Sequence, residues 1–228
     1  MNYEDLRRIW DEGSAKYEQR SSLLSACPLP AEYLPHAGDK VLDAGCGAGN
    51  FLPMYQQIAR AVFGLDFSFA MATAARRRGD VALGDVQRLP FANGEFTYVS
   101  SLLVINHVLD NCAALTELAR VTQPCGRVVV LVPNRFSCLT PLRVLAIKLG
   151  KYSLGLCRHY TTTMLREEGA QNGLTLVRTC AVPKPPTAVN LLRYIPTLLG
   201  YTLDQIVRTV DPLWGGDLAV MFEKRSAD

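Results

Sequence analysis

The stretch KVLDAGCGAGNF, residues 40–51, places an apolar run that ends in a carboxylate directly before a turn with glycine at alternate positions. The run predicts a β-strand, and the residues from Asn50 onward predict a helix. Glycine lacks a Cβ, so it adopts positive φ freely and lets a ligand lie against the backbone. In an open α/β sheet the first strand-to-helix turn is the usual anchor for a ligand. The stretch therefore predicts a ligand-binding turn, with a purely structural tight turn as the alternative.

The sequence on either side repeats this alternation of short apolar runs and helical stretches. Near-continuous aliphatic and β-branched runs alternating with helices are typical of a parallel sheet covered on both faces. A doubly wound α/β fold follows, with Ser68 expected to cap one helix. The expected strands are 40–44, 61–66, 81–85, 96–104, 126–133, 174–182 and 217–225, and the expected helices are 50–60, 68–78, 112–121 and 161–173.

Composition limits the class of protein. With 228 residues and 49% hydrophobic content, the chain can fill one core, so one domain is expected. No run approaches the roughly 18 apolar residues that span a bilayer, and the N-terminus is too acidic for a signal peptide, which predicts a soluble, cytoplasmic protein. The seven cysteines include no Cys-x-x-Cys pair and the three histidines lie far apart, so we expect reduced, mostly buried cysteines and no metal site.

Charge is distributed unevenly, although the net charge is only +3. Between residues 118 and 203 the only acids are Glu167 and Glu168, among many bases. The one compact basic run, residues 76–78, falls at the expected end of a helix, where cations suit the negative end of the helix dipole. No aromatic residues or recognised binding motif accompany it, so we expect a solvated helix terminus and no nucleic-acid partner.

Three acids stand at the expected ends of neighbouring strands, namely Asp43, Asp66 and Asp85. Asp66 follows Gly45 by about 20 residues, the spacing at which a carboxylate accepts hydrogen bonds from the ribose hydroxyls of a nucleoside. Buried carboxylates are costly without partners, and a cationic nucleoside would supply them. A dinucleotide fingerprint would need a third glycine where Asn50 stands, and no triphosphate-binding loop motif is present.

Four ordered segments, VLDAGCGAGNF, VFGLDFSFAM, GDVQRLPFANGEF and LTELARVTQPCGRVVVLVPN, lie within residues 40–134. Together they resemble the class I S-adenosylmethionine-dependent methyltransferases, in particular the branch that includes the ubiquinone and menaquinone biosynthesis methyltransferases. A looser similarity extends over residues 161–180. The resemblance implies a Rossmann-like methyltransferase fold, a mostly parallel seven-stranded sheet with an antiparallel last strand and helical insertions. Where family members commonly have an acid and a glycine, this chain has Thr97 and Cys125, which we interpret as variation in packing.

The resemblance also implies the cofactor, S-adenosyl-L-methionine, and its site. The glycine turn would cradle the methionine and ribose parts, Asp66 would hold the ribose, and Asp43 would face the ammonium group. Phe67 and Met71 would flank the adenine, whose edge would meet the residues at 85–86. The full set implied for the cofactor is Asp43, Gly45, Cys46, Gly47, Gly49, Asp66, Phe67, Met71, Asp85, Val86, Ser101 and Leu102.

Residues 1–228 are expected to form a single methyltransferase domain with parts of different roles. Tyr3, Leu6, Ile9, Trp10 and Tyr17 recur at near-helical spacing, which predicts an amphipathic helix that packs over the cofactor cleft or, alternatively, on the sheet edge. The parts are a helical lid at 1–36, a cofactor-binding half at 37–134, and substrate-cap insertions at 135–160 and 183–216.

The expected reaction is methyl transfer to a small lipophilic acceptor, with or without an anionic group, achieved mainly by positioning for in-line displacement. This acceptor class rests on the apolar stripes and one-sided charge of the two insertions, which also allow peripheral membrane contact or a homodimer through the apolar faces. His107 and His159 are the candidate general bases. A role in capping or packing the following helix is the alternative for His107, whereas His159 is also a candidate substrate contact, with Tyr160 beside it as a second polar contact. Two other functions stay open, a non-catalytic cofactor-binding subunit and a nicotinamide-dependent oxidoreductase.

Overall fold

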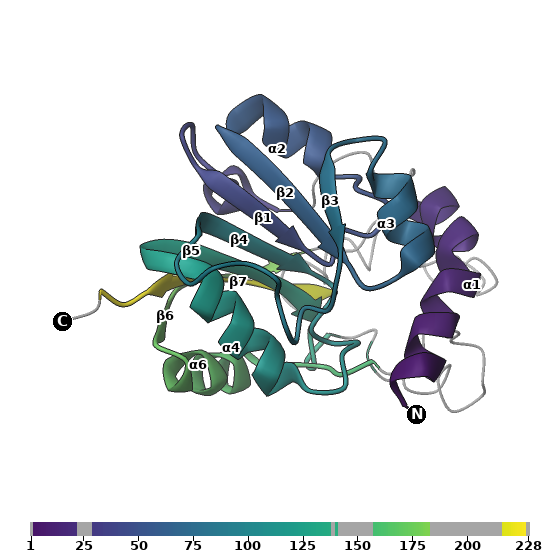
Figure 1. Ribbon diagram of the computed structural model, residues 1–228. Coiled ribbons are helices and arrows are strands. Elements are labelled where there is room, and N and C mark those ends of the chain that lie inside the picture. Colours follow the sequence, from purple (N-terminus) through teal and green to yellow (C-terminus); the bar gives the residue numbers. More distant parts are fainter. Residues whose placement is uncertain (1, 22–28, 138–139, 141–156, 183–215, 227–228) are drawn as a thin grey trace, which may run out of the picture.

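The computed structural model describes residues 2–21, 29–137, 140, 157–182 and 216–226. Within them the chain forms a seven-stranded sheet with the order β3-β2-β1-β4-β5-β7-β6 (Figure 1). The first five strands in this order pair in parallel, whereas β7 runs antiparallel to both of its neighbours. The predicted fold class is thus confirmed. The strands are β1 (Lys40–Ala44), β2 (Ala61–Asp66), β3 (Asp80–Leu83), β4 (Phe96–Leu102), β5 (Thr122–Pro133), β6 (Leu174–Val182) and β7 (Asp217–Lys224).

Helices cover both faces of the sheet. One buried cluster joins the sheet to α4 and α6 through Leu115, Leu118 and Leu165, and a second joins the other face to α2 through Leu52 and Tyr55. Such two-sided burial explains why the inner strands are almost wholly apolar. The described helices are α1 (Tyr3–Ser21), η1 (a 3₁₀ turn, Ala31–Tyr33), α2 (Leu52–Ile58), α3 (Phe69–Ala75), α4 (Asn111–Val121) and α6 (Thr162–Gln171).

Local sequence signals set most of the boundaries. The Ser68 side chain accepts a hydrogen bond from the Met71 backbone N–H and caps α3 as expected, and Asp110 and Thr161 cap α4 and α6 in the same way. After α6, Gly173 takes φ +70° and turns the chain into β6. These caps satisfy helix-end N–H groups that would otherwise lack partners.

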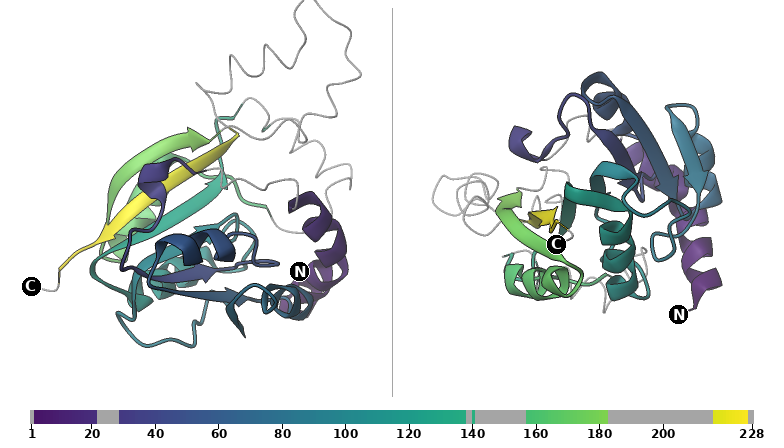
Figure 2. Two further views of the ribbon diagram at one scale, coloured as in Figure 1. Left: turned by 90° about the horizontal axis from the view of Figure 1, so that it is seen from above. Right: turned by 60° about the vertical axis from the view of Figure 1, so that its left-hand side comes forward.

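Helix α1 lies beside the carboxyl ends of the parallel strands and packs against α3 (Figure 1). The C-terminal end of β7 lies on the opposite side of the molecule, as the left view of Figure 2 also shows. Helix α1 thus lies at the end of the sheet that also holds the glycine turn and the acids at the strand ends.

Three strands differ from their predicted limits by two residues or more. β4 ends at Leu102 and not at Val104, because Leu103 takes φ 60° and turns the chain away from the sheet. β3 ends two residues before Asp85, which lies in the following turn. β5 begins at Thr122, directly after α4, so it is longer than the predicted run.

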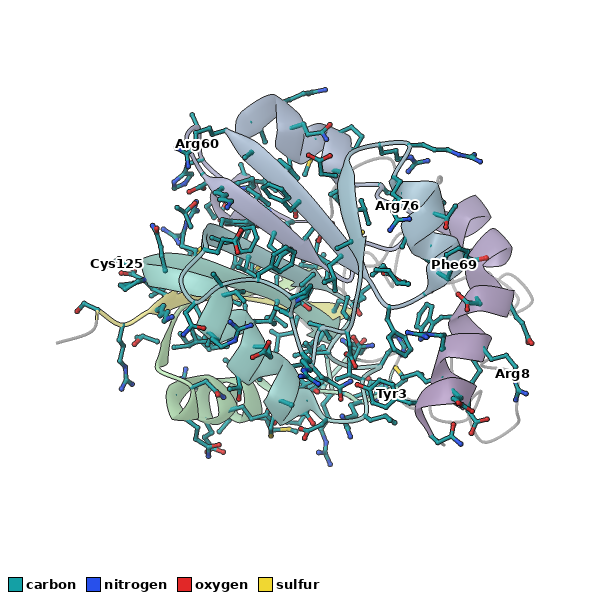
Figure 3. The ribbon with its side chains drawn as sticks, viewed as in Figure 1. Tyr3, Arg8, Arg60, Phe69, Arg76 and Cys125 are labelled. Atoms are coloured by element: carbon teal, nitrogen blue, oxygen red, sulfur yellow. The ribbon has the colours of Figure 1, made fainter. Side chains whose placement is uncertain are left out.

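Two cysteine expectations need correction. Of the five described cysteines only Cys46 is buried, whereas Cys112 and Cys125 are exposed, so the expectation of mostly buried cysteines is wrong. Figure 3 labels Cys125. Cys125 also has φ 59°, a conformation that glycine adopts without strain. Cys125 stands where family members commonly have glycine. The backbone conformation explains that preference for glycine, so the interpretation of Cys125 as a variation in packing is wrong. The predicted insertions lie mostly outside the described residues, including Arg143, Lys148 and Trp214.

Candidate cofactor site

The glycine turn between β1 and α2 forms the floor of the candidate site. Gly45 has φ 85°, and its N–H donates to the Leu65 carbonyl on β2 at 2.7 Å. A Cβ on Gly45 would lie 2.3 Å from Cγ2 of Val104, in the segment after β4. Glycine is required here because this segment packs onto the turn, so the structural alternative explains part of the motif.

Asp43, at the end of β1, is a buried carboxylate with an incomplete set of partners. The Ser100 hydroxyl donates to Oδ1 at 2.9 Å, while Oδ2 has no hydrogen-bond partner among the described residues. The side chain is 1% exposed. Burial raises its pKa to about 7, an effect that the Ser100 hydrogen bond opposes and the neighbouring Asp66 reinforces. A cation brought to Oδ2 would relieve this penalty.

Asp66, at the end of β2, organises the turn. Its carboxylate accepts from the Gly47 N–H at 2.8 Å and from the Ser68 N–H at 2.9 Å. Burial nevertheless raises its pKa to about 6, because these hydrogen bonds only partly offset desolvation. A carboxylate has about four acceptor positions, so Asp66 can take further donors such as ribose hydroxyls.

Cys46 lies within the glycine turn, beside the same two acids. Burial, with Asp43 and Asp66 nearby, raises the pKa of its thiol. The thiol therefore stays protonated, and it packs against Gly64, whose added Cβ would lie 3.0 Å from the Cys46 Sγ. Its role in the site is to fill space and not to act as a nucleophile.

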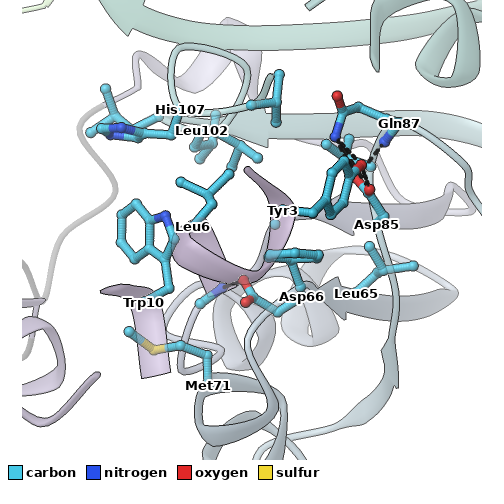
Figure 4. A pocket seen from close by; sticks show the side chains of 17 residues that line it. Tyr3, Leu6, Trp10, Leu65, Asp66, Met71, Asp85, Gln87, Leu102 and His107 are labelled. Atoms are coloured by element: carbon cyan, nitrogen blue, oxygen red, sulfur yellow. Dashed lines mark hydrogen bonds between the residues drawn. The ribbon is translucent and has the colours of Figure 1, made fainter. Parts of the chain in front are cut away.

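Asp85 lies beyond β3 and is bound by two side chains. Gln87 donates to it from its backbone N–H at 2.9 Å and from its side-chain amide, and the Tyr3 hydroxyl donates to Oδ2. The Tyr3 ring meets Phe67 edge to face with centroids 5.4 Å apart. The first turn of α1 is thus joined to the strand ends, as Figure 4 shows.

These groups surround a cavity of about 80 Å³ (Figure 4). Its wall combines two acids with a largely apolar lining supplied by α1, the strand ends and the segment after β4. The lining residues are Tyr3, Leu6, Trp10, Gly45, Gly47, Leu65, Asp66, Phe67, Met71, Asp85, Val86, Gln87, Leu102, Leu103, Val104, His107 and Val108.

The structure separates the two candidate histidines. His107 lines the cavity, and its ring packs edge to face against Trp10 with centroids 5.1 Å apart. His159 is not among the lining residues. Next to it, Tyr160 is buried and donates its hydroxyl to the Ile105 carbonyl at 3.3 Å, which indicates a structural role and not the substrate contact considered from the sequence.

Nine of the fourteen sequence-predicted site residues line the cavity. The other five are Asp43, Cys46, Gly49, Ser101 and His159. Sequence reasoning missed the contributions of Gln87 and of the segment 103–104. Gln87 lies two residues after Asp85, close enough in sequence to suggest a local hydrogen bond, whereas the turn at Leu103 gave no sequence signal.

The described residues hold no group of three or more His, Cys, Asp or Glu side chains that could bind a metal ion. Over the same residues, no helix is both long and apolar enough to cross a membrane. The site combines the buried carboxylates of Asp43 and Asp66 with a turn of glycine residues, which have no side chains. These features fit a ligand with an ammonium group, a sulfonium group and a ribose.

Comparison with known proteins decides the class of this domain. The family model described as methyltransferase domain matches residues 42–130, the span that holds the glycine turn and the three acids. Residues 42–130 form a methyltransferase domain. The resemblance inferred from the sequence is confirmed, and with it the class of enzyme and the cofactor of this domain family, S-adenosylmethionine.

Curated methyltransferases are similar to part of this chain. A malonyl-[acyl-carrier protein] O-methyltransferase from Erwinia billingiae is 33% identical over 134 residues, 57% of this chain and 53% of the relative. A demethylmenaquinone methyltransferase from Mycobacterium sp. (strain JLS) is 41% identical over 95 residues, 41% of each chain. The chain thus spans about half the length of the relatives it matches.

Solved structures extend the likeness of fold to nearly the whole chain. The methyltransferase chain of a complex with the Haloferax volcanii Trm112 methyltransferase activator has a TM-score of 0.74 and 19% identity, covering 98% of this chain and 99% of that one. A SAM-dependent methyltransferase from Thermotoga maritima has a TM-score of 0.73 and 22% identity, covering 96% and 99%. At these identities the likeness shows the fold alone.

Proposed function

We propose that the protein transfers a methyl group from S-adenosylmethionine to a small lipophilic acceptor. The observation that carries the cofactor assignment is the pair of buried acids at the glycine turn. Within the described part of the chain, one Asp43 oxygen has no hydrogen-bond partner, and Asp66 has spare acceptor positions. Burial raises the pKa of both acids. A ligand with a cationic end and a ribose would supply the missing partners.

The residues of the chain would act mainly by holding and desolvating the reactants. Bound S-adenosylmethionine supplies an electrophilic methyl group on a sulfonium. Asp66 would fix the ribose, and Asp43, held by Ser100, would attract the ammonium end. Leu102 and Val104 would exclude water beside the turn, which favours an in-line displacement because positioning and desolvation lower its barrier.

The acceptor class follows from the rest of the lining. Asp66 and Asp85 are the acids that line the cavity. The wall toward α1 and the segment after β4 is built from Leu6, Trp10, Leu103, Val104 and Val108. No lysine or arginine occurs among the described lining residues, so an anionic group on the acceptor would rely on the basic residues of 135–160. The named acceptors of the two relatives differ from each other, so the likeness does not select one.

His107 is the candidate general base for an acceptor that must lose a proton. It lines the cavity at the rim formed after β4, whereas His159 does not line it. Positioned proton transfer contributes about 10²- to 10⁴-fold to a rate. A packing role against Trp10 is the alternative for His107.

The test is a methyl-transfer screen of hydrophobic phenols and acids against hydrophilic amines and nucleic acids. We expect turnover only with hydrophobic acceptors, and we expect Arg143→Glu/Lys148→Glu to slow transfer to anionic ones. The matched control is Arg60→Glu/Arg225→Glu, because both residues are exposed and neither lines the cavity. Turnover confined to hydrophilic acceptors would refute the acceptor class. Cofactor binding without turnover of any acceptor would favour the non-catalytic subunit.

A further inference from the structure

Tyr3, in the first turn of α1, occupies the position that the proposed site assigns to adenine. Its hydroxyl donates to Asp85 and accepts from the Gln87 side-chain amide, and its ring packs on Phe67. Asp85 and Phe67 are the residues expected to meet the edge and the face of the adenine. Figure 4 shows the Tyr3 hydroxyl hydrogen-bonded to Asp85 and Gln87.

Three donor groups surround the Asp85 carboxylate: the Gln87 backbone N–H, the Gln87 side-chain amide and the Tyr3 hydroxyl. Oδ1 accepts from the Gln87 N–H at 2.9 Å and from its side-chain amide at 3.0 Å; Oδ2 accepts from the same amide at 3.2 Å and from the Tyr3 hydroxyl. A carboxylate offers about four such positions. An amino group arriving at this edge competes with these donors, and Tyr3 is the donor that comes from a separate element.

The space available leads to the same conclusion. Pockets that hold ligands of cofactor size are several hundred Å³ in volume, and the cavity here is about 80 Å³. The Leu6 side chain of α1 is buried. Asp11, also on α1, accepts hydrogen bonds through its carboxylate from the Ser68 hydroxyl and from the Ala70 N–H. These contacts hold the helix from Leu6 onward, so Tyr3 can leave without detaching the rest of α1.

We propose that Tyr3 competes with the adenine of the cofactor for Asp85 and Phe67, so that the first turn of α1 gates cofactor entry. The inference rests on the proposed cofactor site. It predicts the opposite sign from a helix that only clamps the bound cofactor. Removal of a clamp weakens cofactor binding. Removal of a competitor strengthens it, because the cofactor no longer has to displace Tyr3 from the closed state.

Calorimetric titration of the full chain with S-adenosylhomocysteine tests this sign. We expect Tyr3→Ala to bind about 5- to 10-fold more tightly than wild type, and Tyr3→Phe about threefold more tightly, since it loses only the hydrogen bond. The control is Arg8→Ala, on the same helix, whose side chain is 69% exposed and points away from the sheet (Figure 3). Its affinity should stay within about twofold of wild type.

The possible outcomes distinguish failure of the gate from failure of the proposed cofactor site. Unchanged or weaker binding by both Tyr3 variants overturns the inference, and if Asp66→Asn weakens binding in the same series, the proposed cofactor site stands without it. Binding by Tyr3→Ala where wild type shows none would support the gate in its strongest form. If neither wild type nor Tyr3→Ala binds, the proposed function and the gate fall together.

Discussion

Replacing Asp66 by asparagine tests the ribose contact with little change in shape. The Asp66 carboxylate joins the glycine turn to the start of α3 through the N–H groups of Gly47 and Ser68. Alanine would leave both N–H groups without their acceptor, so a loss of binding could come from a loosened turn. Asparagine removes the charge and keeps one acceptor oxygen, so one of the two N–H groups retains its partner and the turn is disturbed less than by alanine.

The expected loss can be worked from the hydrogen bonds involved. Hydrogen bonds to a charged group contribute about 1.5–3 kcal/mol, and a tenfold change in affinity corresponds to about 1.4 kcal/mol. Loss of the charge-assisted ribose contact should therefore weaken S-adenosylhomocysteine binding by about 10- to 150-fold. The fold should survive, because burial already penalises the ionised form of Asp66, whose pKa is raised to about 6.

The assay is isothermal titration with S-adenosylhomocysteine near pH 7.5, accompanied by thermal unfolding of each variant. Asp80→Asn is the matched control, since Asp80 is exposed and lies at the far end of β3. We expect it to bind as wild type does. An Asp66→Asn protein that unfolds like wild type and also binds with wild-type affinity would refute the assignment of Asp66 to the ribose.

Five further outcomes are expected. Burial raises the pKa values of the two acids at the turn to about 7 and about 6, so the cofactor-free protein should gain stability as pH falls through this range. For the same reason S-adenosylhomocysteine, which favours the ionised acids, should bind more tightly with rising pH and release protons on binding. Calorimetric titration across this pH range, in two buffers of different ionisation enthalpy, measures the affinity and the proton release. An affinity that does not change with pH contradicts the argument. Gly45→Ala should unfold at lower temperature and bind weakly, because the new Cβ meets Val104. Cys125→Gly should unfold at higher temperature, because the left-handed conformation costs other residues about 1–2 kcal/mol. With an active acceptor, His107→Gln should slow turnover at least tenfold more than His159→Gln does, and equal effects would remove His107 as the base.

Elements defined by local patterns could be predicted from the sequence. β1, β2 and β6 have the predicted bounds, and Ser68 caps α3, because apolar runs and capping side chains act over a few residues. The acids of the site were predicted for a similar reason. In a parallel sheet the strand ends meet at one edge, so the position of an acid at a strand end already places it.

Contacts between distant segments could not be predicted in this way. The hydrogen bond from Tyr3 to Asp85 joins residues 82 positions apart, and nothing in the helical periodicity of α1 specifies it. The approach of Val104 to Gly45 depends on the left-handed turn at Leu103, a conformation that leucine rarely adopts. Tertiary packing creates both features.

The most direct test of the central claim is a crystal structure of the full chain with S-adenosylhomocysteine. We expect the ribose hydroxyls on the Asp66 carboxylate, the ammonium end toward Asp43, and the adenine against Phe67 with the Tyr3 ring displaced. A ligand bound away from the glycine turn, or one whose ribose makes no contact with Asp66, would contradict the account.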